Sequence, residues 1–340
     1  MKILMSSHFF VPLVGGLVTV SEILANEFVR QGHKVILITQ NPVPGPDNFR
    51  FQVIPQPGPS QLLNLVRWCD VFFHNNISLR VAWPLLCIRR PWVVAHHIWL
   101  PSEGGIKRLN GRIKRNAIRY VRNIAVSKAM ADHIGASSEV ISNPYDPAKF
   151  HVIREIPKDK ELLFLGRLIS DKGLALLLKA LSRLKTKGLT PALTVIGSGP
   201  DEEVSRVLVR DLGLEAQVRF AGEKQGRVLT EALNAHKILV VPSLWNEPFG
   251  IVALEGIACG CVVVGSDGGG LADAIGQCGV TFPNGDVDAL AACLSELLRH
   301  PEHAERHRAA APAHLARHHP SDVAKRYLAV FADATKRVQS

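Results

Sequence analysis

Short apolar runs alternate along the chain with longer segments of helical periodicity. The runs show little polar alternation, which is typical of strands in a parallel sheet that helices cover on both faces. In the first half of the chain, strands are expected at residues 2–5, 34–39, 70–74, 92–96, 123–126 and 139–141. A helix at residues 18–31 is expected to connect the first two strands.

The second half of the chain repeats the same pattern. Strands are expected at residues 161–165, 192–196, 218–221, 238–241, 261–265 and 280–282, and helices at 172–185, 202–212, 227–235, 253–259, 287–298 and 320–338. Residues 146–160 contain prolines and charges without periodicity and are expected to form a linker. This double βαβ repetition predicts an α/β protein with two doubly wound domains.

The composition is that of an ordinary globular protein of two domains. The 340 residues are 47% hydrophobic and 21% charged, a balance that supports folded cores. The most apolar region, residues 81–100, is interrupted by Arg89 and Arg90 and does not read as a membrane span. The first ten residues do not resemble a signal peptide, and the six cysteines show no paired zinc spacing. We therefore expect a cytoplasmic enzyme with reduced thiols.

The formal net charge of +10 favours phosphate-rich partners. Basic residues concentrate in the segment from Ile106 to Arg122, which contains no acidic residue and has apolar residues at helical spacing. Such a basic amphipathic helix could associate peripherally with an anionic membrane, or it could be a solvated helix face. Nucleic acid is less favoured, because the chain lacks interleaved aromatic residues, zinc-finger spacing and a basic zipper.

The segment after the strand at 238–241 carries the most informative chemistry. Glu247 is expected on a strand-to-helix loop, with Glu255 one to two turns inside the next helix. The backbone N–H groups of Phe249, Gly250 and Ile251 should then lie at the helix start, where anions and polarised hydroxyls bind. Two carboxylates beside free amides suit a polyhydroxyl ligand that carries phosphate.

Two cations offer a partner for a diphosphate. Arg167 and Lys172 lie at an expected strand end and helix start, flanked by Gly166 and Gly173. Arginine supplies a planar fork and lysine a point charge. A divalent metal held by an Asp-x-Asp motif can also offset the charge of a diphosphate. No convincing Asp-x-Asp follows a strand here, so the two cations would take the place of a metal. The alternative is that both are surface cations near a turn.

Two glycine loops could approach a phosphate closely. Gly15 and Gly16 follow the first strand, and Gly197 begins the sequence Gly-Ser-Gly-Pro. Neither loop has the G-x-G-x-x-G spacing of a dinucleotide site, and either could be only a tight turn.

His303 and His307 have the spacing of a metal-binding pair on one helix face. No third ligand is suggested, so a surface helix is expected there.

Together these motifs resemble those of retaining glycosyltransferases with the GT-B fold, most closely family 4. The resemblance rests on Glu247 and Glu255 as an E-x7-E signature and on the glycine loops, the Gly166–Lys172 segment and Gly268-Gly269-Gly270 in the expected order. It implies two Rossmann-like domains facing across a cleft. The first would comprise residues 1–150 plus the terminal helix 320–340, on the acceptor side. Residues 151–319 would bind the nucleotide sugar.

The resemblance also implies roles for the site residues. Arg167 and Lys172 would offset charge on the diphosphate, Glu247 would contact the donor sugar, and Glu255 would bind the ribose hydroxyls. Backbone at Phe249, Gly250, Ile251 and Val252, together with Gly15, Gly16, Gly166 and Gly197, would line the nucleotide site. His96 would position substrates, with His97 also possible. A Pro-Glu usually follows the Gly-Gly turn, whereas this chain has Leu271-Ala272.

We therefore expect a retaining, metal-independent glycosyltransferase that needs no cofactor. Its donor would be a nucleotide diphosphate sugar, with a UDP- or GDP-sugar favoured, and its acceptor a lipid-linked or cell-surface glycan intermediate at the inner face of the plasma membrane. A small-molecule tailoring glycosyltransferase, such as one acting on an antibiotic, is an alternative. A GT-B sugar-nucleotide epimerase and a non-catalytic nucleotide-binding partner are two further alternatives.

Overall fold

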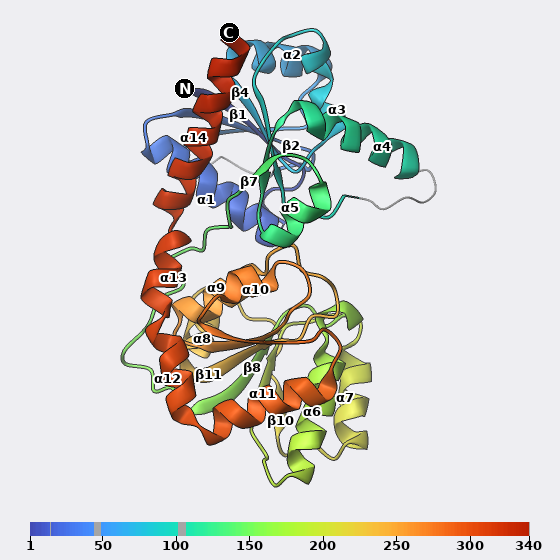
Figure 1. Ribbon diagram of the computed structural model, residues 1–340, viewed down its shortest axis with the longest axis vertical. Coiled ribbons are helices and arrows are strands. Elements are labelled where there is room, and N and C mark those ends of the chain that lie inside the picture. The colour runs from blue at the N-terminus through green and yellow to red at the C-terminus, as the bar shows by residue number, and fades with distance from the viewer. Residues whose placement is uncertain (14, 44–48, 101–106, 340) are drawn as a thin grey trace. The chain divides into compact units, whose positions relative to one another are not determined.

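The computed structural model describes residues 1–13, 15–43, 49–100 and 107–339, which form two compact units. Unit 1 contains Met1–Pro144 and His318–Ser340, and unit 2 contains Tyr145–Arg317 (Figure 1). The sequence placed the first boundary after residue 150. The structure assigns the residues just before it to unit 2, because Phe150 is buried and the hydroxyl of Thr230 donates to the Lys149 carbonyl at 2.9 Å.

Unit 1 is built on a seven-stranded sheet in the order β3-β2-β1-β4-β5-β6-β7, with parallel pairing throughout. This is the doubly wound order, in which the chain reverses direction across the sheet after β3. The strands are β1 (Lys2–Ser7), β2 (Lys34–Thr39), β3 (Gln52–Pro55), β4 (Val71–Asn75), β5 (Trp92–His96), β6 (Arg122–Ala125) and β7 (Ser138–Val140).

Adjacent residues of β4 show how this sheet is covered on both faces. Successive side chains of a strand point to opposite faces. Phe72 therefore packs in the cluster that includes residues of α2 (Pro59–Trp68), whereas Phe73 contacts rings of α1 (Gly16–Arg30) and α14 (Pro320–Gln339). Burial on both faces explains why the strand sequence is apolar without alternation.

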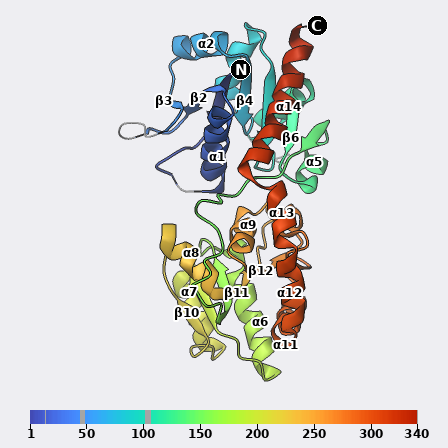
Figure 2. The same cartoon turned by 90° about the vertical axis from the view of Figure 1, so that its left-hand side faces the viewer.

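The C-terminal helix α14 is attached to unit 1 by an aromatic cluster. Tyr327 and Phe331 from α14 are fully buried with Phe28 of α1 and Phe73 of β4. Ring centroids in this cluster lie 5.2 to 6.4 Å apart, within the range of favourable aromatic pairs. Figures 1 and 2 both show α14 running beside α1.

Unit 2 has a six-stranded parallel sheet in the order β10-β9-β8-β11-β12-β13. The strands are β8 (Lys160–Leu165), β9 (Leu193–Ile196), β10 (Val218–Phe220), β11 (His236–Val241), β12 (Val262–Ser266) and β13 (Gly279–Phe282). The order again reverses beside the first strand of the unit, so β8 and β11 flank the topological switch point.

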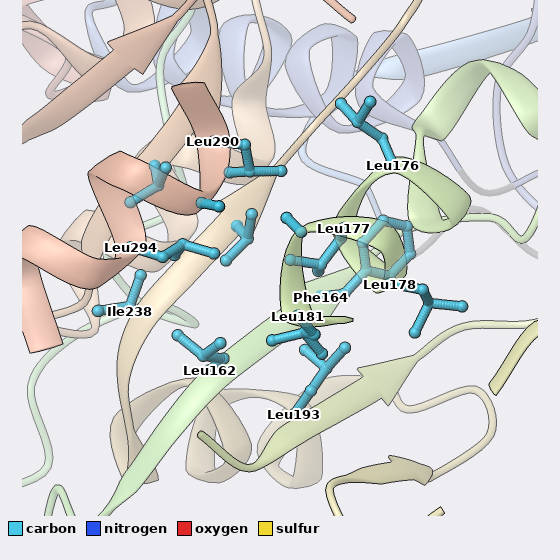
Figure 3. Packing of buried hydrophobic residues seen from close by; sticks show 14 of the residues in the cluster. Leu162, Phe164, Leu176, Leu177, Leu178, Leu181, Leu193, Ile238, Leu290 and Leu294 are labelled. Carbon is cyan, nitrogen blue, oxygen red and sulfur yellow. The ribbon is translucent and has the colours of Figure 1, made fainter. Parts of the chain in front are cut away.

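Helices α6 (Leu174–Thr186) and α11 (Val287–Arg299) cover one face of this second sheet. Figure 3 shows Leu177, Leu181 and Leu290 from these helices packed toward Leu162 and Phe164 of β8. The alternate residues of the strands, such as Leu239 of β11, point to the opposite face of the sheet. On that opposite face, α9 (Ile251–Ala258) approaches β11 so closely that a Cβ on Gly256 would lie 2.4 Å from Leu239 Cδ2.

The remaining helices connect strands or follow the last strand of unit 2. They are α3 (Leu79–Ala82), η1 (Trp83–Leu86), α4 (Lys107–Ala117), η2 (Ile118–Tyr120), α5 (Lys128–Ile134), η3 (Ser170–Lys172), α7 (Glu202–Asp211), α8 (Gly226–Ala235), α10 (Leu271–Ile275), α12 (Pro301–Ala309) and α13 (Ala311–Arg317). The sequence missed β3, which pairs with β2, stands at the edge of the sheet formed by the described strands and ends in a proline.

The sequence suggested one helix over the basic segment from Ile106 to Arg122, but the structure does not continue the helix to Arg122. Ile106 lies outside the described residues, α4 ends at Ala117, and the chain passes through η2 into β6. The helix ends early because Ile118 is buried and because Arg122, the last residue of the segment, pairs in parallel with Val93 of β5 as the first residue of β6. Within the described residues, we find no helix with the length and apolarity to span a bilayer.

The aromatic cluster gives a stability prediction. Phe331→Ala should lower the free energy of unfolding by about 3–5 kcal/mol, because it removes a fully buried ring and leaves a cavity. Four of the five tryptophans lie in unit 1, so tryptophan fluorescence during urea denaturation reports mainly on this unit.

Tyr327→Phe is the matched control in the same cluster. Among the described residues, the buried Tyr327 hydroxyl has no hydrogen-bond partner, so its removal should leave stability unchanged or raise it. A loss of several kcal/mol in Tyr327→Phe, or none in Phe331→Ala, would contradict this account of how α14 is held.

Candidate functional site

The switch point of unit 2 brings together the two loops that the sequence singled out. In open parallel sheets, ligands bind beyond the carboxyl ends of the strands where the strand order reverses. The loop after β8 carries Arg167 and Lys172, and the loop after β11 carries Glu247. Because β8 and β11 are parallel neighbours, these residues emerge at the same sheet edge.

Lys172 and Glu247 form an ion pair across the two loops. The Lys172 Nζ donates to Glu247 Oε1 at 2.6 Å, and the hydroxyl of Ser243 donates to the same oxygen at 2.9 Å. The side chain of Lys172 is 32% exposed and that of Glu247 only 13%. The carboxylate is thus held by two donors, while the Lys172 side chain as a whole stays partly exposed to solvent.

Lys172 lies in η3, not at the start of the long helix as the sequence suggested. Gly173 follows in the left-handed conformation with φ 73° and separates η3 from α6. A Cβ at this position would lie 1.8 Å from the carbonyl oxygen of Pro242. Only glycine therefore lets the Lys172 loop approach the end of β11 this closely.

The loop that carries Glu247 is fixed by its backbone. The N–H of Leu244 donates to the Asp171 carbonyl at 2.8 Å, which ties it to the Lys172 loop. The carbonyl of Glu247 itself accepts from Gly270 N at 2.6 Å. Gly269 has φ 75°, and a Cβ there would lie 2.3 Å from that same carbonyl oxygen. Although Leu271-Ala272 replaces the usual Pro-Glu, the triple-glycine turn still supports the loop, and α10 begins after it.

Two further glycines hold the loop that carries Arg167. Gly197 has φ 140°, and a Cβ there would lie 1.9 Å from the carbonyl oxygen of Gly166. Gly166 in turn lies against the stem of Lys172, whose Cγ would be 3.9 Å from an added Cβ. The N–H of Leu168 donates to the Ser198 carbonyl at 2.9 Å. Gly197 therefore has a packing role, and the Arg167 side chain is left exposed.

The helix that follows Glu247 begins where the sequence expected free amides. Gly250 is the N-cap of α9, with φ 100°, and Ile251 and Val252 are its first residues. The N–H of Ala253 donates to the Gly250 carbonyl at 3.0 Å, whereas the N–H groups of Ile251 and Val252 have no acceptor four residues earlier within the helix and can meet an anion or a hydroxyl. Phe249 is buried and anchors the loop, so its side chain contributes packing.

Glu255 lies in the second turn of α9. Desolvation raises the pKa of its carboxyl to about 7, an effect that nearby Lys149 partly offsets and Asp146 reinforces. Lys149 and Asp146 are themselves paired at 3.2 Å. A carboxyl that is close to half-ionised at neutral pH is poised to gain from hydroxyl donors, which favour the charged form.

The other predicted residues belong to unit 1. Gly15 is the N-cap of α1 with extended backbone, Gly16 is its first helical residue, and an added Cβ at Gly15 would meet no atom within 4 Å. Packing within unit 1 therefore does not require glycine at position 15. The open space leaves room for a ligand near this loop.

The two histidines after β5 differ in their surroundings. The Nε2 of His96 lies 2.9 Å from Asn123 Oδ1, and burial lowers the pKa of the ring to about 4. The backbone N–H of His97 donates to Asn76 Oδ1 at 2.7 Å, while its own Nε2 is buried without a hydrogen-bond partner among the described residues. Burial lowers the pKa of His97 to about 3. Both rings are therefore neutral at pH 7, and the His96 ring already forms a hydrogen bond with Asn123 of β6.

Ser243 is the contributor that sequence reasoning missed. It is buried directly beyond the end of β11 and binds the oxygen of Glu247 that Lys172 also binds. Its position just after a predicted strand was the signal by which the sequence could have identified it.

The two histidines with metal-pair spacing have other partners. His303 pairs with Glu296 at 2.9 Å, and the Nδ1 of His307 lies 2.9 Å from the Gln277 carbonyl oxygen. In the described part of the chain, no three His, Cys, Asp or Glu side chains cluster as metal ligands would.

Two family models match consecutive parts of the chain. The model of glycosyl transferases group 1 matches residues 147–314, and that of Glycosyltransferase Family 4 matches residues 14–149. Glycogen synthase of Mycobacterium tuberculosis is 35% identical over 180 residues, which are 52% of this chain and 43% of that protein. A phosphatidyl-myo-inositol mannosyltransferase of Mycolicibacterium smegmatis is 29% identical over 221 residues, 61% of this chain and 56% of that protein. The matches thus span about half the length of these relatives.

The fold also matches a solved structure over nearly its whole length. HepE of Anabaena, solved in complex with UDP, superposes with a TM-score of 0.82 at 18% identity and covers 98% of this chain and 100% of its own. The same protein has been solved with UDP-glucose. This likeness shows that the two parallel sheets form the GT-B architecture. With two consecutive family models that extend from residue 14 to residue 314, the chain belongs to the group 1, family 4 glycosyltransferases.

Proposed function

We propose that this protein is a retaining, metal-independent glycosyltransferase that uses a nucleotide diphosphate sugar. The observation that carries the proposal is the Lys172–Glu247 pair at the switch point of unit 2, beside the amino end of α9. A cation, a carboxylate and the backbone amides at the start of α9, all at one sheet edge, match the phosphate and hydroxyl groups of such a donor.

Charge on the leaving diphosphate would be offset by protein cations. The Lys172 side chain is partly exposed, and Arg167 is exposed on a loop that the Gly197 contact holds in place. Preorganised cations of this kind stabilise negative charge that develops in a transition state. They support a reaction that does not depend on a divalent ion.

The two glutamates would bind hydroxyl groups of the donor. Glu247 is held by Lys172 and Ser243 through one oxygen, which leaves Oε2 to accept from a sugar hydroxyl. Glu255, with its raised pKa, would accept from the ribose diol and become ionised on binding. Ordered acceptors of this kind fix the anomeric carbon relative to the leaving phosphate.

In the proposed reaction, the bond between the anomeric carbon and the phosphate oxygen breaks as the acceptor oxygen bonds to the same face of that carbon. The acceptor proton passes to the leaving phosphate oxygen, so the products are a glycoside and a nucleoside diphosphate. No protein base is needed, which agrees with the neutral, hydrogen-bonded state of His96. His96 stays a predicted positioning residue.

A UDP- or GDP-sugar is the proposed donor, and the HepE complexes with UDP and UDP-glucose support the first. The proposed acceptor is a lipid-linked or cell-surface glycan intermediate, reached at the cytoplasmic face of an anionic membrane. The similarity to a phosphatidyl-myo-inositol mannosyltransferase and the basic segment around α4 support this choice.

Lys172→Ala should reduce kcat by about 10²–10³-fold, because it removes a cation that offsets charge on the leaving group. Release of the nucleoside diphosphate from a panel of donor sugars measures the effect. Lys179→Ala, which removes an exposed lysine from the adjoining helix α6, is the matched control and should retain full activity. Normal turnover in Lys172→Ala with intact folding would rule out the assigned role.

Thermal unfolding should identify the nucleotide without any metal. With EDTA present, one of UDP, GDP, ADP, CMP and dTDP at about 100 times its Kd should stabilise the protein by about 2.7 kcal/mol. A stabilisation that appears only after Mg²⁺ is added would contradict metal independence. The absence of any shift, with or without metal, would contradict the donor site itself.

Donor affinity should rise by about tenfold between pH 6 and pH 8 because Glu255 ionises in this window and a carboxylate is the stronger acceptor. Titration calorimetry with the preferred nucleoside diphosphate measures the dependence. The terminal phosphate also titrates near pH 6, so Glu255→Gln serves as the reference. The rise should be smaller in the variant, and identical pH profiles would show that Glu255 does not bind the ribose.

The same pKa shift has a consequence for the unliganded protein. The folded carboxyl keeps its proton up to about pH 7, whereas the unfolded carboxyl loses it near its ordinary pKa. The folded state therefore binds more protons between these values, and stability falls as pH rises through this window. Glu255→Gln should flatten this part of the stability profile.

A further inference from the structure

A basic cavity lies in unit 1 at the sheet edge opposite to His96. Its walls include Trp92, the first residue of β5, and Arg122, the first residue of β6, whereas His96 is the last residue of β5. The cavity has a volume of about 580 Å³, within the range of small-ligand sites. None of the residues assigned to donor binding or catalysis lines it.

Among the residues that the structure describes, five arginines and no acidic residue line this cavity. They come from three separate parts of the chain: Arg89, Arg90, Arg119, Arg122 and Arg337. The sequence showed Arg89 and Arg90 only as an interruption of an apolar region. The fold brings them to the end of the basic segment and to the last turn of α14.

The structure fixes part of this arginine set in place. Arg90 donates to the carbonyls of Val66 at 3.2 Å and Arg67 at 2.7 Å. Asp333 forms an ion pair with Arg122 at 2.7 Å and another with Arg337 at 3.3 Å. One carboxylate thus serves two guanidinium groups, and the local charge stays strongly positive.

Arg89 and Arg119 are the two arginines open to an incoming anion. Both are exposed, and within the described residues no carboxylate lies at ion-pair distance from either. Guanidinium groups bind phosphate through paired N–H donors. A phosphate that entered here would meet free arginines at the surface and fixed arginines behind them.

One exposed aromatic side chain lines the same cavity, and an exposed leucine is the sequence neighbour of another lining residue. Tyr120 is on the cavity wall and is 83% exposed. Leu86, next to the lining residue Leu85, is 89% exposed. A soluble anion gains nothing from such exposed apolar groups, whereas a bilayer interface accommodates them beside its charged headgroups.

We propose that this arginine cavity binds the phosphate-bearing headgroup of an anionic membrane lipid, with Tyr120 and Leu86 inserted in the interface. This inference deepens the membrane association proposed above and is independent of the transfer reaction. The sequence suggested that a single amphipathic helix binds the membrane. In the present proposal, Arg119 and Tyr120 bind it together with residues of η1 and α14.

The test is co-sedimentation of the full chain with vesicles, without donor, at low salt. Vesicles of phosphatidylcholine with one-third phosphatidylglycerol are compared with phosphatidylcholine alone. Wild-type protein should bind only the anionic vesicles, and binding should weaken as salt is added. The double variant Arg89→Gln/Arg119→Gln should bind about 30-fold more weakly.

Three variants separate the cavity from the general surface charge, from the apolar contacts and from α4. Arg154→Gln/Arg299→Gln removes the same charge from exposed positions of unit 2 and should bind vesicles normally. Tyr120→Ser should weaken binding to vesicles while leaving retention on phosphocellulose unchanged. Arg112→Gln/Arg115→Gln reports on α4, outside the cavity lining.

Several results would overturn the proposal. Loss of vesicle binding in the α4 variant but not in the cavity variant would return membrane association to the helix. No binding of wild type at low salt would remove membrane association altogether. Equal loss of vesicle and phosphocellulose binding in Arg89→Gln/Arg119→Gln, with no effect of Tyr120→Ser, would indicate a site for a soluble polyanion. Stabilisation by nucleoside diphosphate, measured on each variant, reports separately on the donor site.

Discussion

Parallel pairing of β8 with β11 is the constraint on which the candidate site depends. Lys172 and Glu247 are 75 positions apart in the chain, yet the carboxyl ends of the two strands bring their loops to one place. The loops can meet only because Gly173 fits against the Pro242 carbonyl, where any side chain would clash. A backbone contact of this kind positions an ion pair more firmly than the flexible side chains could.

The electrostatic balance of the site follows from this geometry. Glu247 is largely buried but satisfied by Lys172 and Ser243, so its charge is compensated. Glu255 is desolvated, and the pKa of its carboxyl rises to about 7. Two carboxylates eight positions apart therefore differ in the unliganded site: Glu247 is held by two hydrogen-bond donors, whereas burial raises the pKa of Glu255.

Basic residues serve different purposes in the two units. In unit 2, Lys172 and Arg167 lie at the carboxyl edge of the sheet, where a diphosphate would bind. In unit 1, arginines gather at the amino edge of β5 and β6, around a cavity that adjoins exposed apolar side chains. The excess of positive charge seen in the sequence is thus divided between separate surfaces, which could recognise phosphate on a nucleotide and phosphate on a lipid independently.

The sequence by itself determined the alternating strands and helices and the chemistry of the loops after β8 and β11. It could do so because apolar runs record burial on both faces of a sheet, and because glycines and charges at strand ends are local signals. It placed a strand at residues 123–126 but did not foresee that α4 would end at Ala117, because the burial of Ile118 in η2 depends on tertiary packing that helical periodicity does not record. Nor could it show that Ser243 bonds to Glu247 or that Arg122 and Arg337 share the carboxylate of Asp333. Those contacts exist only because the tertiary structure brings distant segments together, and no local pattern records them.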